Sequence, residues 1–225
     1  MNKIQTMLCA VFSLLLVNTA QADSGNFAGP YIGLNASAYG VSATGGSVAS
    51  KIDTGATGTV EKNDISVGKV VGVVGGEVGY ALPLGSMMLV DVGVSYLAGA
   101  AKIQSDGNDS GTDRVTFEID DHVTAYIAPT IVLSDTSSVY VKVGLSEADT
   151  GVTGNVTSPG QLSGTTWAIG QRTVLDSGIF IRSEAGYTDY NEISSHGNGT
   201  GIATTTSFDA DPSSAYGMIS MGMRF

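Results

Sequence analysis

Apolar and polar residues alternate along most of this chain, from shortly after residue 30 to its last residue. In the first alternating segment, Ile32, Leu34 and Ala36 share one face, opposite Gly33 and Asn35. A period of two predicts β-strands with two chemically different faces. The same alternation predicts eight strands, at residues 31–40, 70–82, 88–98, 123–133, 139–146, 166–175, 179–187 and 216–225.

The connections between these segments are of two kinds, which alternate along the chain. Short, turn-rich connections lie at Pro83–Ser86, Ser134–Ser138 and Asp176–Gly178. Long polar connections cover Val41–Lys69, Gly99–His122, Ser146–Thr165 and Thr188–Ala215. Outer-membrane barrels have this arrangement, with short periplasmic turns and longer external loops. We therefore predict an all-β fold, an eight-stranded antiparallel up-and-down transmembrane β-barrel with four long external loops.

A soluble β-sandwich would also alternate, but with a bulky inner face and a charged outer face. Here the polar face is rich in Gly, Ser and Thr, which favours the narrow lumen of a barrel. The predicted strands approach the length of about 9–11 residues that a tilted strand needs to cross a bilayer. Residues Arg114–Asp121 also alternate, and we expect them to extend their strand beyond the membrane.

The first 22 residues have the pattern of a secretory signal peptide. Lys3 precedes an apolar run over Met7–Val17, and small residues follow at Ala20 and Ala22. We predict cleavage after Ala22, which makes residues 23–225 the barrel. Cys9 lies within the apolar run rather than at the cleavage site, which argues against a lipoprotein. A mature chain without cysteine has no disulfide.

The charge of the chain restricts its partners. The net charge is −11, and removal of Lys3 leaves 21 acids and 9 bases (10 − 1), or −12. Such a charge excludes a nucleic-acid partner on electrostatic grounds. Glycine is abundant, with 31 residues, and the mean hydropathy is nevertheless positive at +0.18. Finely interleaved apolar and polar residues account for that combination.

Two sets of residues stand out on the two predicted faces. Ionisable side chains of both signs lie on the polar face, where an eight-stranded barrel has room only for packed side chains. We expect them to pair, because an unpaired buried charge is costly. These lumen residues are Glu77, Asp91, Lys142, Arg172, Arg182, Glu184 and Arg224. A paired lumen favours a filled core, and a water-filled pathway lined by the same ions is the alternative.

On the lipid-facing side, aromatic residues fall near the ends of the predicted strands, as in the aromatic girdles of membrane barrels. Tyr96, Trp167 and Tyr187 lie near external ends, and Tyr80 and Phe225 near periplasmic ends.

The long loops carry many acids, and Ser105–Asp113 superficially suggests a Ca²⁺ loop. It lacks the EF-hand spacing, so we interpret it as a solvated loop and predict no metal and no cofactor. His122, near Glu118 and Asp120 by alternation, and His196 are the candidate catalytic bases of a lipid-modifying enzyme. Nothing in their spacing supplies the required geometry, so we predict no enzyme activity.

Three stretches resemble a known family. The closing segment Tyr216–Phe225, the opening segment Gly29–Asn35 and the segment Ile181–Tyr190 are similar to strands of the small OmpA/OmpX-type, opacity-protein-like outer-membrane barrels. The resemblance implies that the barrel-assembly machinery recognises Phe225 as an assembly signal. It also implies a Gram-negative outer membrane, with outer-membrane lipid and lipopolysaccharide as neighbours.

The family includes adhesins, structural proteins and narrow channels, so the resemblance does not decide the function. Our hypothesis is a structural or surface-interaction, adhesin-like role through acidic external loops, with a host or cell-surface ligand as a possible partner. A small passive, porin-like channel is the first alternative, and the lipid-modifying enzyme is the second.

Overall fold

The computed structural model describes residues 23–51, 60–99, 101–104, 116–153, 160–175, 178–196 and 204–225. A short 3₁₀ turn, η1 (Ser24–Asn26), precedes ten strands. The strands are β1 (Gly29–Lys51), β2 (Val60–Pro83), β3 (Met88–Ala98), β4 (Ala101–Gln104), β5 (Thr116–Ser134), β6 (Ser137–Thr153), β7 (Gln161–Val174), β8 (Ile179–Tyr190), β9 (Ile193–His196) and β10 (Thr204–Arg224). No helix in these ranges is long and apolar enough to cross a membrane.

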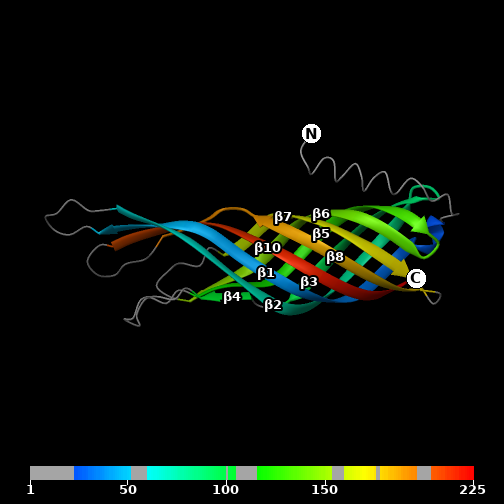
Figure 1. Ribbon diagram of the computed structural model, residues 1–225, viewed down its shortest axis with the longest axis horizontal. Helices are drawn as coiled ribbons and strands as arrows, with labels where there is room; N and C mark the ends of the chain where they lie inside the picture. Colours follow the sequence, from blue (N-terminus) through cyan, green and yellow to red (C-terminus); the bar gives the residue numbers. More distant parts are fainter. Residues whose placement is uncertain are drawn as a thin grey trace.

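The sheet closes on itself as an antiparallel barrel. Its strands follow the order β1-β2-β3-β5-β6-β7-β8-β10, and β10 also pairs with β1. The closing register places Tyr31 opposite Arg224 and Ala38 opposite Gly217. Two short strands lie off this ring, β4 against β5 and β9 against β10. The prediction of an eight-stranded up-and-down barrel is therefore confirmed (Figure 1).

The two faces of the barrel wall are those that the alternation predicted. Large apolar side chains point outward along its strands, including Leu34 at 74% exposed, Ile169 at 60% and Ile219 at 66%. Their neighbours along the chain point inward and are buried, as in β5, where Tyr126 and Thr130 alternate with exposed residues. The outer surface is thus apolar over a broad belt, whereas a soluble protein buries such residues inside.

The strands are longer than predicted, so much of the expected external loops is strand. Residues 41–50 of β1 pair without a break with residues 60–69 of β2, although Val41–Lys69 was predicted to be loop. Residues 204–215 of β10 continue along β1 in the same way. These parts contain many Ser, Thr and Gly residues, whose low hydropathy hides a period of two. The extension of a strand into Arg114–Asp121 is confirmed from Thr116 onward.

The connections between the strands differ at the two ends of the barrel, and these ends lie at opposite sides of Figure 1. We call the end with residues 84–87 and 135–136 the short-turn end, and the opposite one the loop end. At the loop end β1, β2 and β10 project beyond the other strands (Figure 1). Strand β3 pairs with β2 only from Val74 to Pro83. In the part of the chain that the structure describes, β1 alone is therefore hydrogen-bonded to the Val60–Val73 part of β2.

Candidate functional site

The middle of the lumen holds three buried ion pairs among the described residues. Arg182 of β8 bonds through its guanidinium to Glu77 of β2 on the far side of the barrel. Arg172 lies 2.5 Å from Asp91, and Lys142 lies 2.7 Å from Glu184. All six side chains are at most 3% exposed. Three carboxylates and three cations balance, which removes most of the cost of burying them.

Hydroxyl groups satisfy the remaining carboxylate oxygens. Tyr140 and Tyr216 both donate to Glu184, at 2.6 and 2.7 Å. Ser220 donates to Glu77 at 2.9 Å, and Tyr126 donates to the same carboxylate at 3.2 Å. Each carboxylate therefore accepts several hydrogen bonds at once, as a buried ion pair requires if it is to be stable.

Tyrosine rings fill the lumen because glycines lie directly beneath them. Tyr140 pairs with Gly170 across β6 and β7, and Tyr216 pairs with Gly186 across β10 and β8. A Cβ atom at either glycine would overlap the phenol ring of its partner. The same pairing joins Tyr31 with Gly79, Tyr126 with Gly93, and Phe180 with Gly222. Much of the glycine on the polar face thus provides space for aromatic rings, a device known from designed sheets.

A strap of residues 23–28 closes the lumen at the short-turn end. Phe27 is fully buried against an apolar cluster that includes Tyr31, Leu89 and Phe180. The Ser24 hydroxyl donates to the carbonyl of Gly85 at 2.6 Å, and its backbone N–H donates to Ser86 at 2.8 Å.

The strap also bonds to the other side of the mouth. Asn26 donates to the Asp135 carbonyl at 3.3 Å. Arg224, predicted as a lumen ion, is half-buried and donates to the carbonyls of Gly25 and Ala28 at 3.2 and 3.3 Å. Its structural contribution is to hold the strap rather than to join an ion pair among the described residues.

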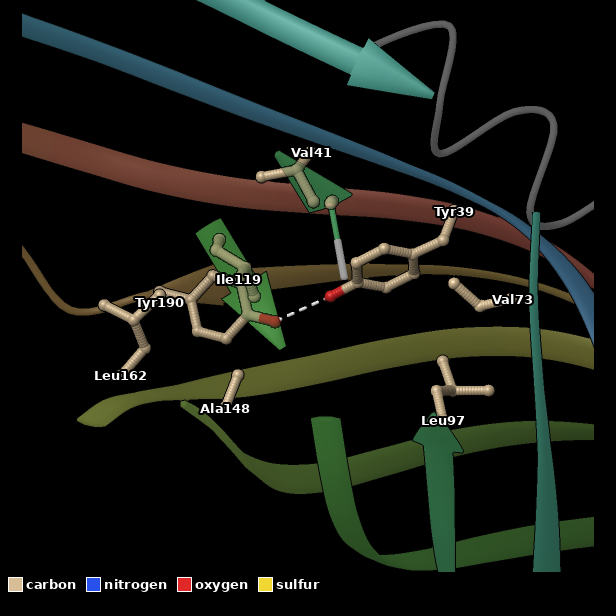
Figure 2. Packing of buried hydrophobic residues seen from close by; sticks show 9 residues of the cluster. Tyr39, Val41, Val73, Leu97, Ile119, Ala148, Leu162 and Tyr190 are labelled. Carbon is tan, nitrogen blue, oxygen red and sulfur yellow. Dashed lines mark hydrogen bonds between the residues drawn. The ribbon is translucent and has the colours of Figure 1, made fainter. Parts of the chain in front are cut away.

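A second apolar cluster closes the lumen at the loop end. Tyr39 of β1 and Tyr190 of β8 meet inside the barrel, with 2.8 Å between their hydroxyl oxygens (Figure 2). Apolar side chains surround this pair and are at most 7% exposed; they are Val41, Val73, Leu97, Ala101, Ile119, Ala148 and Leu162. We call this set the loop-end cluster. The ion pairs therefore lie between two layers of buried, mainly apolar side chains.

His122 does not lie beside Glu118 and Asp120, contrary to the prediction. A bulge interrupts β5 between Asp120 and Val123, and Asp121 adopts a φ of 49° there. The extra residue changes which side chains face inward. Ile119 therefore faces inward in place of Glu118 and Asp120. His122 keeps the inward face of Thr124 and points into the loop-end cluster, 5% exposed, with its ring 5.7 Å from that of Tyr39.

His122 lies one residue beyond Val123, the partner of Tyr96, and so outside the apolar belt. Burial lowers the pKa of its imidazole to about 4. The backbone of His196 belongs to β9, which pairs with β10, and no nucleophile is placed beside His122 by any described contact. Within the described ranges, no group of three or more His, Cys, Asp or Glu residues could hold a metal ion. The stretch Ser105–Asp113 lies outside them.

The aromatic residues predicted to form girdles all lie on the outer surface. Tyr80, Tyr96, Trp167 and Tyr187 are between 40% and 55% exposed, and Phe225 is 72% exposed. Trp167 and Tyr187 are direct partners across β7 and β8, at one level of the wall. The Tyr96 hydroxyl bonds to the carboxylate of Asp121 at the bulge, so this ring marks the border between the apolar belt and the polar loop end.

A match to a family model identifies the family of this chain. The family model described as "Outer membrane protein beta-barrel domain" matches residues 8–210. The chain belongs to this family. It is therefore an outer-membrane protein of a Gram-negative bacterium, as predicted. A search of curated proteins found no match.

One solved structure supports the fold of this outer-membrane barrel, and a second is reported beside it. The outer membrane protein OprG from Pseudomonas aeruginosa has a TM-score of 0.55 at 14% identity, covering 92% of this chain and 99% of that one. Ail, the attachment invasion locus protein of Yersinia pestis, has a TM-score of 0.45 at 11% identity, covering 85% and 99%. At such identities the likeness concerns the fold alone. Because outer-membrane barrels have their short turns on the periplasmic side, we expect the short-turn end to face the periplasm and the loop end to face the exterior.

Sequence reasoning missed three parts of this arrangement. The strap was not predicted, although Phe27 is an apolar residue that precedes the first strand. The role of the lumen tyrosines was also missed, although their alternation with apolar residues assigns them to the polar face beside glycines and acids. The loop-end cluster was concealed within expected loops. Residues 1–22 lie outside the described ranges, so the signal peptide stays a prediction, as does recognition of Phe225.

Proposed function

We propose that this outer-membrane barrel is a non-conducting surface protein that binds extended protein segments through its projecting β2–β1–β10 sheet. The Val60–Val73 edge of β2 carries the proposal, because β1 is its only strand partner in the described chain. An unpaired strand edge presents N–H and C=O groups that can pair with a strand from another protein. The partner would be an extended segment on another cell or surface.

The opposite edge of the projecting sheet supports this choice by contrast. There β9 pairs with β10 from Ser207 to Ala210, whereas no described strand pairs with the outer edge of β2 from Val60 to Val73. The β2 edge carries charges of both signs in Glu61, Lys62 and Asp64. Charges on an edge strand oppose indiscriminate self-pairing, which suits a surface that must select its partner.

The packed side chains of the lumen support the non-conducting part of the proposal. An ion crossing the barrel would have to displace the strap, separate the buried ion pairs and enter the loop-end cluster. In planar bilayers the refolded chain should therefore show no conductance steps above the lipid background. Steady openings of the wild-type chain would contradict the proposal and favour the channel alternative.

A deletion at the tip of the sheet tests the surface role. Thr44 pairs with Ser66, so replacing residues 45–65 by an Asn-Gly turn should shorten the hairpin without disturbing its register. Cells that display this variant should lose adhesion to a protein-coated or cellular surface that the wild type binds. Deletion of residues 154–159, in another external connection, is the matched control and should leave adhesion intact. Heat-modifiable migration on gels would verify that both variants fold.

Loss of adhesion in both variants, or in neither, would contradict a role for the β2 edge.

A further inference from the structure

A polar hollow opens on the external part of the wall, where β8 separates from β7. The last pair between the two strands is Gly164 with Tyr190. The chain then leaves β7 and resumes against β10 as β9, with Ile193 opposite Ala210. Pro212 lies opposite this break and has no N–H to donate. The gap left beside β7 is a hollow of about 210 Å³.

The rim of the hollow consists of small polar groups. Gln161, Ser163, Asn191, Glu192 and Ser194 line it, and all five are exposed. Two apolar residues complete the lining and are turned toward the barrel interior; Leu162 is 1% exposed in the loop-end cluster, and Ile193 packs against that cluster. The polar residues of the rim therefore surround two apolar residues that pack against the loop-end cluster.

Asn191 is held in place by two bonds to one residue. Its backbone N–H donates to the carbonyl of Ser163, and its Nδ2 donates to the Ser163 Oγ, both at 2.8 Å. The Ser163 Oγ accepts from Asn191, so the Ser163 hydroxyl can still donate its hydrogen to a ligand. The Oδ1 of Asn191 can accept a hydrogen bond from the same ligand. Gln161 adds both a donor and an acceptor. The rim thus offers donors and acceptors side by side in a fixed arrangement.

This chemistry fits a sugar ring. Each hydroxyl of a pyranose both donates and accepts, which matches neighbouring amide, hydroxyl and carboxylate groups. The residues that line the hollow include Glu192 but neither lysine nor arginine. A phosphate or an acidic sugar would therefore meet repulsion without a compensating cation.

The hollow also lies at the height where the sugars of membrane glycolipids would be found. Toward the loop end, Ser163 lies four residues from Trp167 along β7. Asn191, which directly follows β8, lies four residues from Tyr187 in the same direction. Four residues of strand span about 13 Å. Trp167 and Tyr187 mark the headgroup level of the membrane, so the hollow lies just outside it. We propose that this hollow binds a neutral pyranose, either from a glycolipid of the surrounding membrane or from a free glycan.

This proposal goes beyond the proposed function, because it concerns β7 and the β8–β9 junction rather than the β2 edge. Shortening residues 45–65 should leave sugar binding unchanged, so either proposal can fail alone.

The test is NMR titration of the full chain, refolded in lipid nanodiscs, with methyl α-glucopyranoside, methyl α-galactopyranoside and methyl α-mannopyranoside. At least one should shift the amides of residues 161–163 and 191–194, with a Kd on the order of 1–10 mM for so small a ligand. Glucuronate should bind more weakly than the neutral sugar, and Glu192→Gln should reduce that difference.

Asn191→Ala removes the clamp and should weaken binding by about tenfold. Ser163→Val, a second variant, should have a similar effect. Ser42→Val is the matched control, since Ser42 is another exposed strand serine bonded across strands, with 2.9 Å between its Oγ and that of Ser213. Its binding should equal that of the wild type.

Nanodiscs that contain lipopolysaccharide with or without neutral core sugars separate the two sources. If only the complete core displaces the glycoside, the sugar belongs to the membrane; if neither does, it is a free glycan. The proposal is overturned if these amides do not shift at about 100 mM glycoside, if glucuronate binds as well as the neutral sugars, or if Asn191→Ala and Ser163→Val bind as tightly as the wild type.

Discussion

The phenol ring of Tyr140 occupies the space that a side chain at Gly170 would fill, and the two residues are direct partners across β6 and β7. This contact leaves the Tyr140 hydroxyl 2.6 Å from Glu184. The glycine therefore determines where the tyrosine lies, and the tyrosine in turn satisfies an oxygen of a buried carboxylate. Glycine content, aromatic packing and ion pairing are connected through this one pair.

Gly170→Ala should destabilise the barrel by about 1–3 kcal/mol, because the new methyl group displaces Tyr140 from Glu184. Denaturant unfolding in detergent micelles, followed by the fluorescence of Trp167, measures the change. Gly72→Ala is the matched control, since a Cβ there would meet no atom within 4 Å. It should change stability by less than about 0.5 kcal/mol. Equal effects of the two substitutions would refute the packing role of Gly170.

Removal of one partner from a central ion pair should be more costly than removal of both. Arg182→Met leaves the Glu77 carboxylate buried without its cation, at a cost of about 3–5 kcal/mol. The double variant Arg182→Met/Glu77→Gln should recover more than half of that loss. The neutral amide can still accept from Ser220 through its oxygen, and its NH2 group can donate to the hydroxyl oxygen of Tyr126. A double-mutant cycle of unfolding free energies measures the coupling. Additive losses would show that the pair contributes no coupling.

The sequence predicted the wall of this barrel better than its contents. Outward-facing residues such as Leu34 and Ile219 could be assigned by alternation alone, because lipid on one side and lumen on the other impose a strict period of two. The partner of Arg182 could not be assigned. Glu77 lies 105 residues away, and which charges meet inside a barrel depends on register and stagger, which alternation does not encode.

Two local features also escaped prediction for physical reasons. The bulge at Asp121 adds one residue to β5, and every parity argument made across it therefore reverses. This reversal turned Ile119 into the barrel in place of Glu118 and Asp120, so the carboxylates expected beside His122 do not share its face. The strap around Phe27 is not a strand, so its sequence does not alternate. Hydrogen bonds to backbone carbonyls of distant turns, such as that of Gly85, hold it in place, and the sequence does not show which turns these are.

Phe27→Ala should loosen the strap while the barrel stays closed. The side chain is fully buried, and its loss removes about 3 kcal/mol of packing from a short segment. Amide exchange at Phe27 and Ala28, whose N–H groups donate to the Ser24 carbonyl, should accelerate about 100-fold. Bilayers should still show no conductance, because the ion pairs and the loop-end cluster remain. Leu84→Ala, in an exposed turn nearby, is the control and should leave these exchange rates unchanged.

His122 should remain neutral down to unusually low pH. Burial lowers its folded pKa to about 4, whereas an unfolded histidine titrates near about 6.5. Protons therefore bind the unfolded chain first, so His122 reduces stability progressively as pH falls from about 6.5 to 4, and not above that window. The chain has two histidines, so His196→Gln leaves one imidazole to follow by NMR. A titration midpoint near 4 is expected in micelles. A midpoint near 6.5 would mean that the loop-end cluster is open to water, and with it the external end of the lumen.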